Sequence, residues 1–540
     1  MPRLRARVRV AALALVAMAA LARAHAQNPV STGFTLVEGL GLPAVDLDAL
    51  SGQPHAINTV RTRRAAALET AIASTARIGP SGAAYAPGRV LVKFRGGPAA
   101  AVTAASLRTT SATATLSTRP DYADFDIVRI DPGEDPQQVA AALRQRSDVE
   151  WAQPAYYMHT NLVPNDPDYK SGRQWHLTLI DIERAWDIQP SAGSSITVAV
   201  IDTGLAYTTA TITTNILGFR GRFGTYPPIG NAMIPYSAAT QLITPGRIVS
   251  PHDFIHNTGT PLDFDGHGTH VSGTIGQLTN DGTGGAGVAF NVKLMPLKVI
   301  CADWDVLFGT PESTCSTDDL VAQAIRFAAD NGAKVINMSI GRDSPSNCAT
   351  NRNQPDCAPA IEDAMNYAVG KGVFIAVAAG NEFTGGNPTQ TPAEICSRIK
   401  GAVSVAAIGV QKEHAPYSSS GSWVELAAPG GSGGSEDSGY VWQQTFDFRF
   451  TDTFDLPPSQ YGPPRFDILR SIGYAGTSQA APHVAGLAAM LIQQGLTSPA
   501  AVEAALEMFA VDLGAKGRDD LFGYGLVDAR DALFGLGLAR

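Results

Sequence analysis

The chain has 540 residues, of which 44% are hydrophobic and 16% charged, with 54 glycines and 35 prolines. This length and composition are typical of a folded protein with room for more than one domain, and they exclude an intrinsically disordered chain. The formal net charge of −9 provides no basic surface for nucleic acid, so we expect no nucleic-acid partner.

Residues 1–26 have the pattern of a secretory signal peptide. Arginines alternate through residues 3–9, an apolar stretch follows at 10–21, and small residues at 24 and 26 suit a cleavage site. The apolar stretch is too short to span a bilayer, and no later stretch reaches about 18 uninterrupted apolar residues. We therefore predict export to the medium or the periplasm, with no membrane partner.

Two segments follow before the main domain. Residues 27–84 show little periodicity, and we interpret them as a loosely structured leader. Residues 85–161 have the pattern of a small α+β domain. Its predicted elements are a strand with Val90, Val92 and Phe94 on one face, a second strand at 125–130, a helix capped by Asp135, and a closing strand at 149–152.

Residues 162–540 form the predicted main domain. Short apolar runs rich in β-branched residues predict strands at 196–201, 293–299, 334–340, 373–379 and 403–408. Residues 318–330 have helical spacing and end at Asn331-Gly332. Alternating strands and helices indicate an α/β fold, in which a mostly parallel sheet carries helices on both faces.

Three side chains in this domain suit acyl transfer. A buried strand ends at Asp202, a glycine-framed loop carries His267 into a helix, and Ser478 lies where a glycine-rich loop becomes an apolar helix. Open α/β sheets place ligand chemistry at the carboxyl ends of strands, and a helix N-terminus stabilises an oxyanion. A serine at a helix start is equally often a simple cap, so Ser478 alone leaves both roles open.

The motifs around Asp202, His267 and Ser478, in that chain order, resemble those of the subtilisin-like serine peptidases, and the resemblance covers residues 164–535. It implies that His267 takes the proton of Ser478 and that Asp202 orients the imidazole. It also implies a subtilisin-like version of the predicted α/β fold.

The same resemblance assigns supporting residues. Asn381, in the segment 378–382, is expected to donate its side-chain amide to the oxyanion beside the Ser478 backbone N–H. Ser339 and Gly341 are expected to pair with the substrate backbone. Arg342 stands where relatives have a second small residue.

Residues 85–161 resemble the inhibitory propeptide of this family, and the alternative is an unrelated adaptor domain. As a propeptide, the segment would cover the active site and act as an intramolecular inhibitor. We expect the enzyme to cleave itself within about five residues of Asn161, with the severed propeptide staying bound until it is degraded.

Calcium is the cofactor that the resemblance implies. Asp166, Leu278 and Asn280, with the loop 281–284, resemble the site that holds the mature N-terminus in relatives. Carboxylate, amide and carbonyl oxygens are the ligands that Ca²⁺ prefers. We expect a structural role for the ion.

Export favours disulfides over metal ligation for the five cysteines, and no CxxC pair supports a zinc site. Comparison with secreted relatives implies a bridge between Cys357 and Cys396. Cys301 and Cys315 would then close an inserted loop, which leaves Cys348 free.

Two insertions extend the catalytic core, at 208–251 and 431–472. Aromatic residues at 446, 448 and 450 predict a β-hairpin with one buried face, which either borders the substrate cleft or covers core. The predicted function is a monomeric, secreted serine endopeptidase that cleaves polypeptides broadly and is made as a zymogen. The alternatives are a narrow processing peptidase, whose cleft the insertions wall off, and an inactive binding protein that retains the fold.

Overall fold

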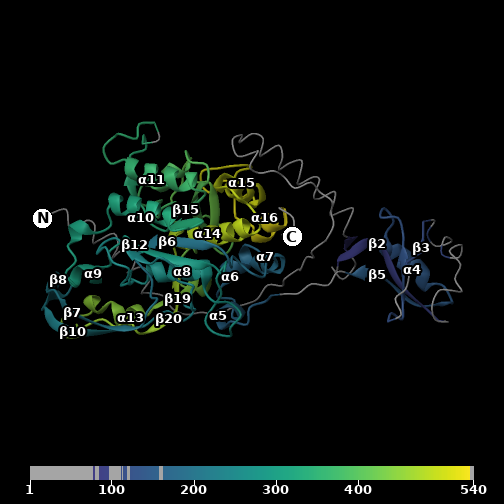
Figure 1. Cartoon of the computed structure of the whole chain (residues 1–540), viewed down its shortest axis with the longest axis horizontal. Helices are drawn as coiled ribbons and strands as arrows, with labels where there is room; N and C mark the ends of the chain where they lie inside the picture. Colours follow the sequence, from purple (N-terminus) through teal and green to yellow (C-terminus); the bar gives the residue numbers. More distant parts are fainter. Residues whose placement is uncertain are drawn as a thin grey trace. The chain divides into compact units, whose positions relative to one another are not determined.

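The computed structural model describes residues 77–78, 84–95, 107, 111, 113–117, 122–156, 162–348 and 350–535. The described residues 77–156 belong to one compact unit and the described residues 162–535 to another (Figure 1). The predicted signal peptide, 1–26, and almost all of the predicted leader, 27–84, lie outside the described residues. In the part of the chain that the structure describes, no helix is long and apolar enough to cross a membrane.

The first unit is a small antiparallel sheet with one helix, as the sequence predicted. Its elements are β1 (Arg77–Ile78), β2 (Ala84–Phe94), β3 (Thr115–Leu116), β4 (Asp126–Arg129), α4 (Pro136–Arg144) and β5 (Val149–Tyr156). The long strand β2 pairs with β5 and with β4. Asp135 caps α4 by accepting a hydrogen bond from the Gln137 backbone N–H, and Val139 and Leu143 enter the core against the sheet.

The second unit is built on seven strands in the order β11-β12-β6-β13-β15-β17-β18, all of them parallel. Their bounds are β6 (Thr197–Asp202), β11 (His252–Asp253), β12 (Lys293–Lys298), β13 (Val335–Met338), β15 (Phe374–Ala378), β17 (Ala402–Ile408) and β18 (Leu426–Pro429). The predicted α/β fold with a mostly parallel sheet is confirmed, and each predicted strand is present.

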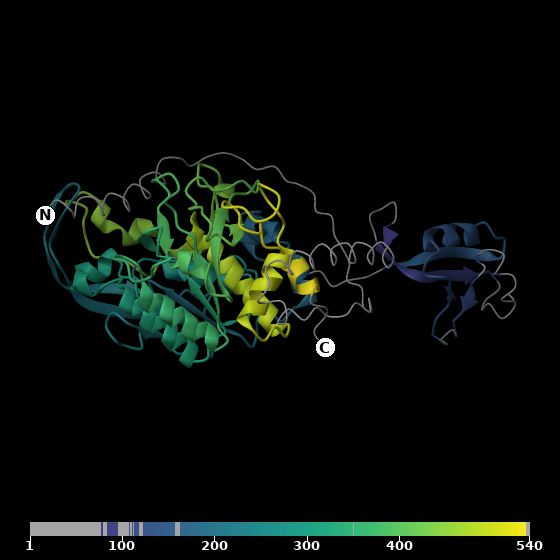
Figure 2. The same ribbon diagram turned by 90° about the horizontal axis from the view of Figure 1, so that it is seen from above.

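Helices cover both faces of this sheet (Figures 1 and 2). The helices α10 (Asp318–Asp330) and α11 (Pro359–Gly370) share a core with Ala199 and Ile201 of β6. Because side chains alternate along a strand, Val198 and Val200 are buried on the opposite face, where α8 (His267–Gly276) and α14 (Thr477–Gln493) pack. Burial on both faces explains the uninterrupted apolar runs of the sequence.

The remaining α-helices have between 4 and 11 residues. They are α5 (Pro167–Lys170), α6 (Trp175–Leu179), α7 (Ile182–Ile188), α9 (Asp303–Leu307), α12 (Ala393–Cys396), α13 (Phe448–Thr451), α15 (Pro499–Phe509) and α16 (Ala529–Gly535).

Both insertions form antiparallel pairs outside the main sheet. The first contains β7 (Ala210–Ile216), β8 (Phe219–Gly221), β9 (Gly224–Tyr226) and β10 (Ile229–Tyr236), and the second contains β19 (Val441–Phe446) and β20 (Leu469–Tyr474). Phe446 is buried in β19, as predicted. The predicted strand does not continue, because Asp447 caps α13 and leaves Phe448 50% exposed.

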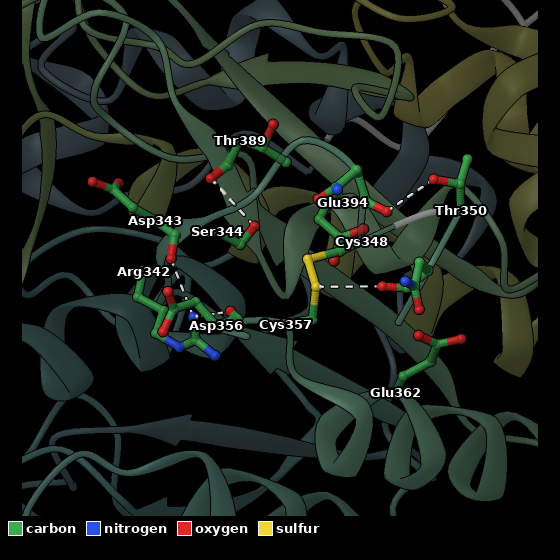
Figure 3. The surroundings of a disulfide bond; sticks show 12 residues. Arg342, Asp343, Ser344, Cys348, Thr350, Asp356, Cys357, Glu362, Thr389 and Glu394 are labelled. Atoms are coloured by element: carbon green, nitrogen blue, oxygen red, sulfur yellow. Dashed lines mark hydrogen bonds between the residues drawn. A yellow bond between two sulfur atoms is a disulfide. The ribbon is translucent and has the colours of Figure 1, made fainter. Parts of the chain in front are cut away.

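The disulfide bonds correct one prediction. Cys301 and Cys315 are bonded as expected, but Cys357 bonds to Cys348 and not to Cys396, which is a buried free thiol (Figure 3). Successive turns fold the chain back between residues 345 and 357 and bring the Cα atoms of Cys348 and Cys357 to 5.6 Å, a normal separation for a disulfide. Residues 344–357 are rich in Ser, Pro, Asn and Asp, which favour turns, but this composition does not indicate which cysteines the turns bring together.

Candidate active site

The carboxylate of Asp202 and the imidazole of His267 form a direct pair. Asp202 is the last residue of β6 and is fully buried, and His267 is the first residue of α8. The His267 Nδ1–H donates to Asp202 Oδ1 over 2.7 Å. The two elements approach so closely that a Cβ on Gly268 would lie 2.3 Å from the Gly204 carbonyl oxygen, so only glycine fits there.

Negative charge around His267 makes its imidazole a stronger base. Burial lowers the pKa of His267, but the carboxylates of Asp202, Asp265 and Asp263 outweigh that effect and raise the pKa from 6.5 to about 9. The side chain is 25% exposed, so one edge of the ring remains open to a reactant. This pair can therefore accept a proton and hold it.

Ser478 lies in the first turn of α14, which packs against both α8 and β6. Its Oγ donates to the Ser339 carbonyl oxygen over 3.1 Å, and Ser339 Oγ donates in return to the Ser478 carbonyl oxygen over 2.8 Å. Asn337 Nδ2 donates to Ser339 Oγ over 2.9 Å. Ser339, predicted to pair with the substrate backbone, is buried and fixes the turn that carries Ser478. In this conformation the Ser478 hydroxyl donates to the Ser339 carbonyl oxygen and not to His267.

Asn381 Nδ2 and the Ser478 backbone nitrogen lie near one point, which Gln479 Oε1 approaches to 2.9 Å. Asn381 Oδ1 accepts hydrogen bonds from the Thr477 N–H over 2.9 Å and from Thr477 Oγ1 over 3.0 Å, so Nδ2 faces away from Thr477. The position that a Cβ on Gly476 would occupy lies 3.5 Å from Asn381 Nδ2 and 3.6 Å from the Ser478 nitrogen. Two converging donors of this kind suit an oxygen atom that gains negative charge.

Gly341 is exposed and directly precedes β14 (Arg342–Ser344), which pairs antiparallel with β16 (Thr389–Thr391). Sequence reasoning missed this pairing, because three-residue strands carry no periodic signal. It also missed Gln390, which lies directly opposite Asp343 in the pair. Arg342 forms an ion pair with Asp318 of α10.

The predicted calcium ligands do not fit a cation. Both Asp166 oxygens accept backbone hydrogen bonds, from the N–H groups of Asn280 at 2.6 Å, Asp281 at 3.0 Å and Gly282 at 3.1 Å. Asn280 Oδ1 accepts from the Asn165 N–H. The Leu278 N–H donates to the carbonyl oxygen of Gln241, a residue of the first insertion.

Three N–H dipoles directed at a carboxylate make an anion-binding concavity, and they use the lone pairs that Ca²⁺ would need. Burial raises the pKa of Asp166, and these hydrogen bonds oppose the rise. Among the described residues, no group of three or more His, Cys, Asp or Glu side chains could hold a metal ion.

Comparisons with known proteins agree with this geometry. A model of the subtilase family matches residues 193–525, and a model of the fervidolysin N-terminal prodomain matches residues 72–155. The chain is 29% identical over 451 residues to a thermophilic serine proteinase of a Bacillus species, covering 83% of this chain and 88% of the relative.

Two further proteins are similar over most of their own length. Thermitase of Thermoactinomyces vulgaris is 30% identical over 355 residues, covering 66% of this chain and 94% of thermitase. Among solved structures, a protease of Pseudoalteromonas arctica matches with a TM-score of 0.50 at 26% identity, covering 69% of this chain and 100% of that protein.

Proposed function

We infer that this chain, which belongs to the subtilase family of serine peptidases and carries a fervidolysin-like prodomain, hydrolyses polypeptides through an acyl-enzyme formed on Ser478. One observation carries the proposal. The nitrogens of Asn381 and Ser478 lie near one point beside Gly476, and the helix that carries Ser478 packs against the two elements that carry the Asp202–His267 pair. A base and two oxyanion donors around one hydroxyl are what acyl transfer requires.

The reaction then runs in two halves. The Ser478 hydroxyl turns from the Ser339 carbonyl toward His267, which takes the proton while Oγ attacks the carbonyl carbon of the peptide bond. Asn381 Nδ2 and the Ser478 N–H stabilise the oxyanion, and Asp202 stabilises the imidazolium. His267 gives its proton to the leaving amine, and a water molecule, deprotonated by His267, hydrolyses the ester.

The labelling of Ser478 tests this mechanism. We expect a fluorophosphonate probe to modify Ser478 in the mature wild-type enzyme, and His267→Ala to suppress the labelling because the base is lost. The heat-denatured wild-type protein serves as the control, because labelling of Ser478 there would report chemical reactivity without the folded site. Absence of labelling in the folded wild type would favour the inactive binding protein.

A second candidate, a narrow processing peptidase, has its own observation. Thr445 Oγ1, in β19 of the second insertion, donates to the Gly266 carbonyl oxygen over 2.6 Å, next to His267. The insertion therefore contacts the segment that carries the catalytic base, which supports a restricted cleft. Cleavage of unfolded casein at many sites would support the broad endopeptidase, and cleavage at one or two sites would support the processing enzyme.

The zymogen part of the proposal concerns residues 85–161, which would inhibit the enzyme until it cuts itself within about five residues of Asn161. Residues 157–161 lie outside the described part of the chain. We expect Ser478→Ala to accumulate with its prodomain attached, while the wild type yields a chain that starts near Pro164. Mass spectrometry of both, after expression in a peptidase-deficient host, decides the point. Correct trimming of Ser478→Ala would mean that another enzyme does the cutting.

Export through the predicted signal peptide and a monomeric state complete the proposal. Secretion of the wild type, with retention of a chain that lacks residues 1–26, would support the first. Light scattering of the Ser478→Ala protein would decide the second.

A further inference from the structure

Gln390 is a buried side chain between the two backbone segments that flank Ser478. It is 4% exposed. A Cβ on Gly380 would lie 2.4 Å from Gln390 Cγ, and a Cβ on Gly341 would lie 3.7 Å from Gln390 Oε1. Gly380 directly precedes Asn381, and Gly341 follows Ser339, whose carbonyl oxygen accepts from Ser478. Gln390 therefore lies on the Cβ side of both glycines.

The orientation of the Gln390 amide is fixed by its partners. Nε2 donates to Asp343 Oδ1 over 2.6 Å and to the Pro388 carbonyl oxygen over 3.4 Å. A carboxylate only accepts hydrogen bonds, so the amide nitrogen must face Asp343 and Oε1 must face Gly341. Among the described residues, none donates a hydrogen bond to Oε1. An acceptor therefore remains available on the side of the reactive serine.

Asp343, which accepts the hydrogen bond from Gln390 Nε2, places a negative charge next to the Gln390 amide. Arg342 uses its guanidinium on both oxygens of Asp318 and on the carbonyl oxygens of Asp356 and Asp343. Asp343 forms no ion pair with any described cation, and its carboxylate points away from the Arg342 guanidinium (Figure 3). Asp356 adjoins Cys357, so the Cys348–Cys357 disulfide closes the loop that holds Arg342 in place.

We propose that Gln390, backed by Asp343, selects substrates in which the residue on the acyl side of the cut bond ends in a hydrogen-bond donor, with lysine as the preferred residue. This inference rests on the proposed function, because the carbonyl oxygen of that residue must lie between Asn381 Nδ2 and the Ser478 N–H. The side chain then projects between Gly341 and Gly380. A lysine ammonium would donate to Gln390 Oε1 in the field of Asp343, whereas an apolar end would bury Oε1 without a partner.

Two peptides that differ only in lysine or norleucine at that residue test the proposal, since norleucine keeps the chain length and lacks the ammonium group. We expect kcat/KM of the wild type to favour lysine by roughly tenfold or more. Gln390→Met should remove this preference, and Asp343→Asn should reduce it roughly threefold to tenfold because only the charge is lost. Asp330→Asn, a change of the same chemistry at the exposed end of α10, should leave the ratio unchanged.

The outcomes separate the two proposals. If the fluorophosphonate labels Ser478 but lysine and norleucine peptides are cut equally well, the selection by Gln390 is wrong while the peptidase assignment stands. If Ser478 is not labelled and neither peptide is cut, both fail. If Gln390→Met does not fold, as shown by a loss of labelling, the wild-type ratio and Asp343→Asn decide. An unchanged ratio in Asp343→Asn would then overturn the proposal.

Discussion

The charge of Asp265 should set the pH at which the enzyme becomes active. Asp265 Oδ1 accepts a hydrogen bond from the backbone N–H of His267 over 3.0 Å. The negative charge of this carboxylate raises the pKa of the His267 imidazole. The surrounding protein and the charge of Asp263 raise the pKa of Asp265 to about 6 although its side chain stays in contact with solvent, so the group is ionised in the alkaline range. Asp265→Asn keeps an acceptor for the N–H and removes the charge.

The size of the effect follows from screened electrostatics. With a dielectric constant between that of bulk water and that of a protein surface, removal of the Asp265 charge should destabilise the protonated imidazole of His267 by about 1 kcal/mol. One pKa unit equals about 1.4 kcal/mol, so the pKa of His267 should fall by about 0.7. His267 must be neutral to act as a base. The acid limb of kcat/KM therefore moves to lower pH, and the alkaline plateau keeps its height.

The assay is kcat/KM of an uncharged peptide from about pH 5 to about pH 10, at low and high salt, with Asp330→Asn as the matched control. The wild-type midpoint should lie above 6.5, because the raised pKa of His267 delays its deprotonation. High salt should shrink the difference between wild type and Asp265→Asn. A wild-type midpoint at or below 6.5, or a midpoint that Asp265→Asn leaves unmoved, would refute the assignment of these charges.

Three other changes test separate parts of the structure. Asn381→Ala should lower kcat by about 10²- to 10³-fold with little change in KM, because one oxyanion donor is lost; a change confined to KM would contradict its role. Burial, followed by the charge of Glu503, raises the pKa of Glu507 to about 8, so stability is full below about 4.5 and falls as pH rises toward 8. Glu507→Gln should therefore raise the free energy of unfolding by about 1–3 kcal/mol at pH 8 and leave it unchanged at pH 4, and equal effects at both would contradict the shift. Asp166→Asn should lower the melting temperature, while a chelator leaves that of the wild type unchanged; a chelator-induced fall would restore the calcium prediction.

The fold could be predicted where local pattern and tertiary role coincide. The strand that ends at Asp202 is buried on both faces, so its apolar run is unbroken, and the helix Asp318–Asp330 shows its spacing directly. Phe448 follows the same alternation as Phe446, but a local capping hydrogen bond from the Arg449 backbone N–H to Asp447 overrides it. Local chemistry of that kind competes with periodicity and wins at the end of a strand.

Some residues of the candidate site could likewise be predicted from local motifs, and others could not. Asp202, His267 and Ser478 stand at element ends within recognisable motifs, and their chemistry could be predicted. The pairing of Cys348 with Cys357 depends on loop turns, and the contact of Gln390 with Asp343 depends on two three-residue strands far apart in the chain. Neither has a periodic signal. Sequence motifs therefore indicate the reaction better than they indicate the selection of substrates.

The backbone hydrogen bonds that Asp166 accepts have a consequence for maturation. In the uncut chain, Asp166 already accepts three backbone hydrogen bonds, the Asn165 N–H donates to Asn280 Oδ1, and the Leu162 N–H donates to Asp187 Oδ1. The segment that would become the new N-terminus is thus anchored before any cut. Cleavage near Asn161 has no need to release Asp166 for a later binding step, because the buried carboxylate is already satisfied. Self-cleavage would then act through separation of the prodomain, and the peptidase domain would keep the fold it has in the zymogen.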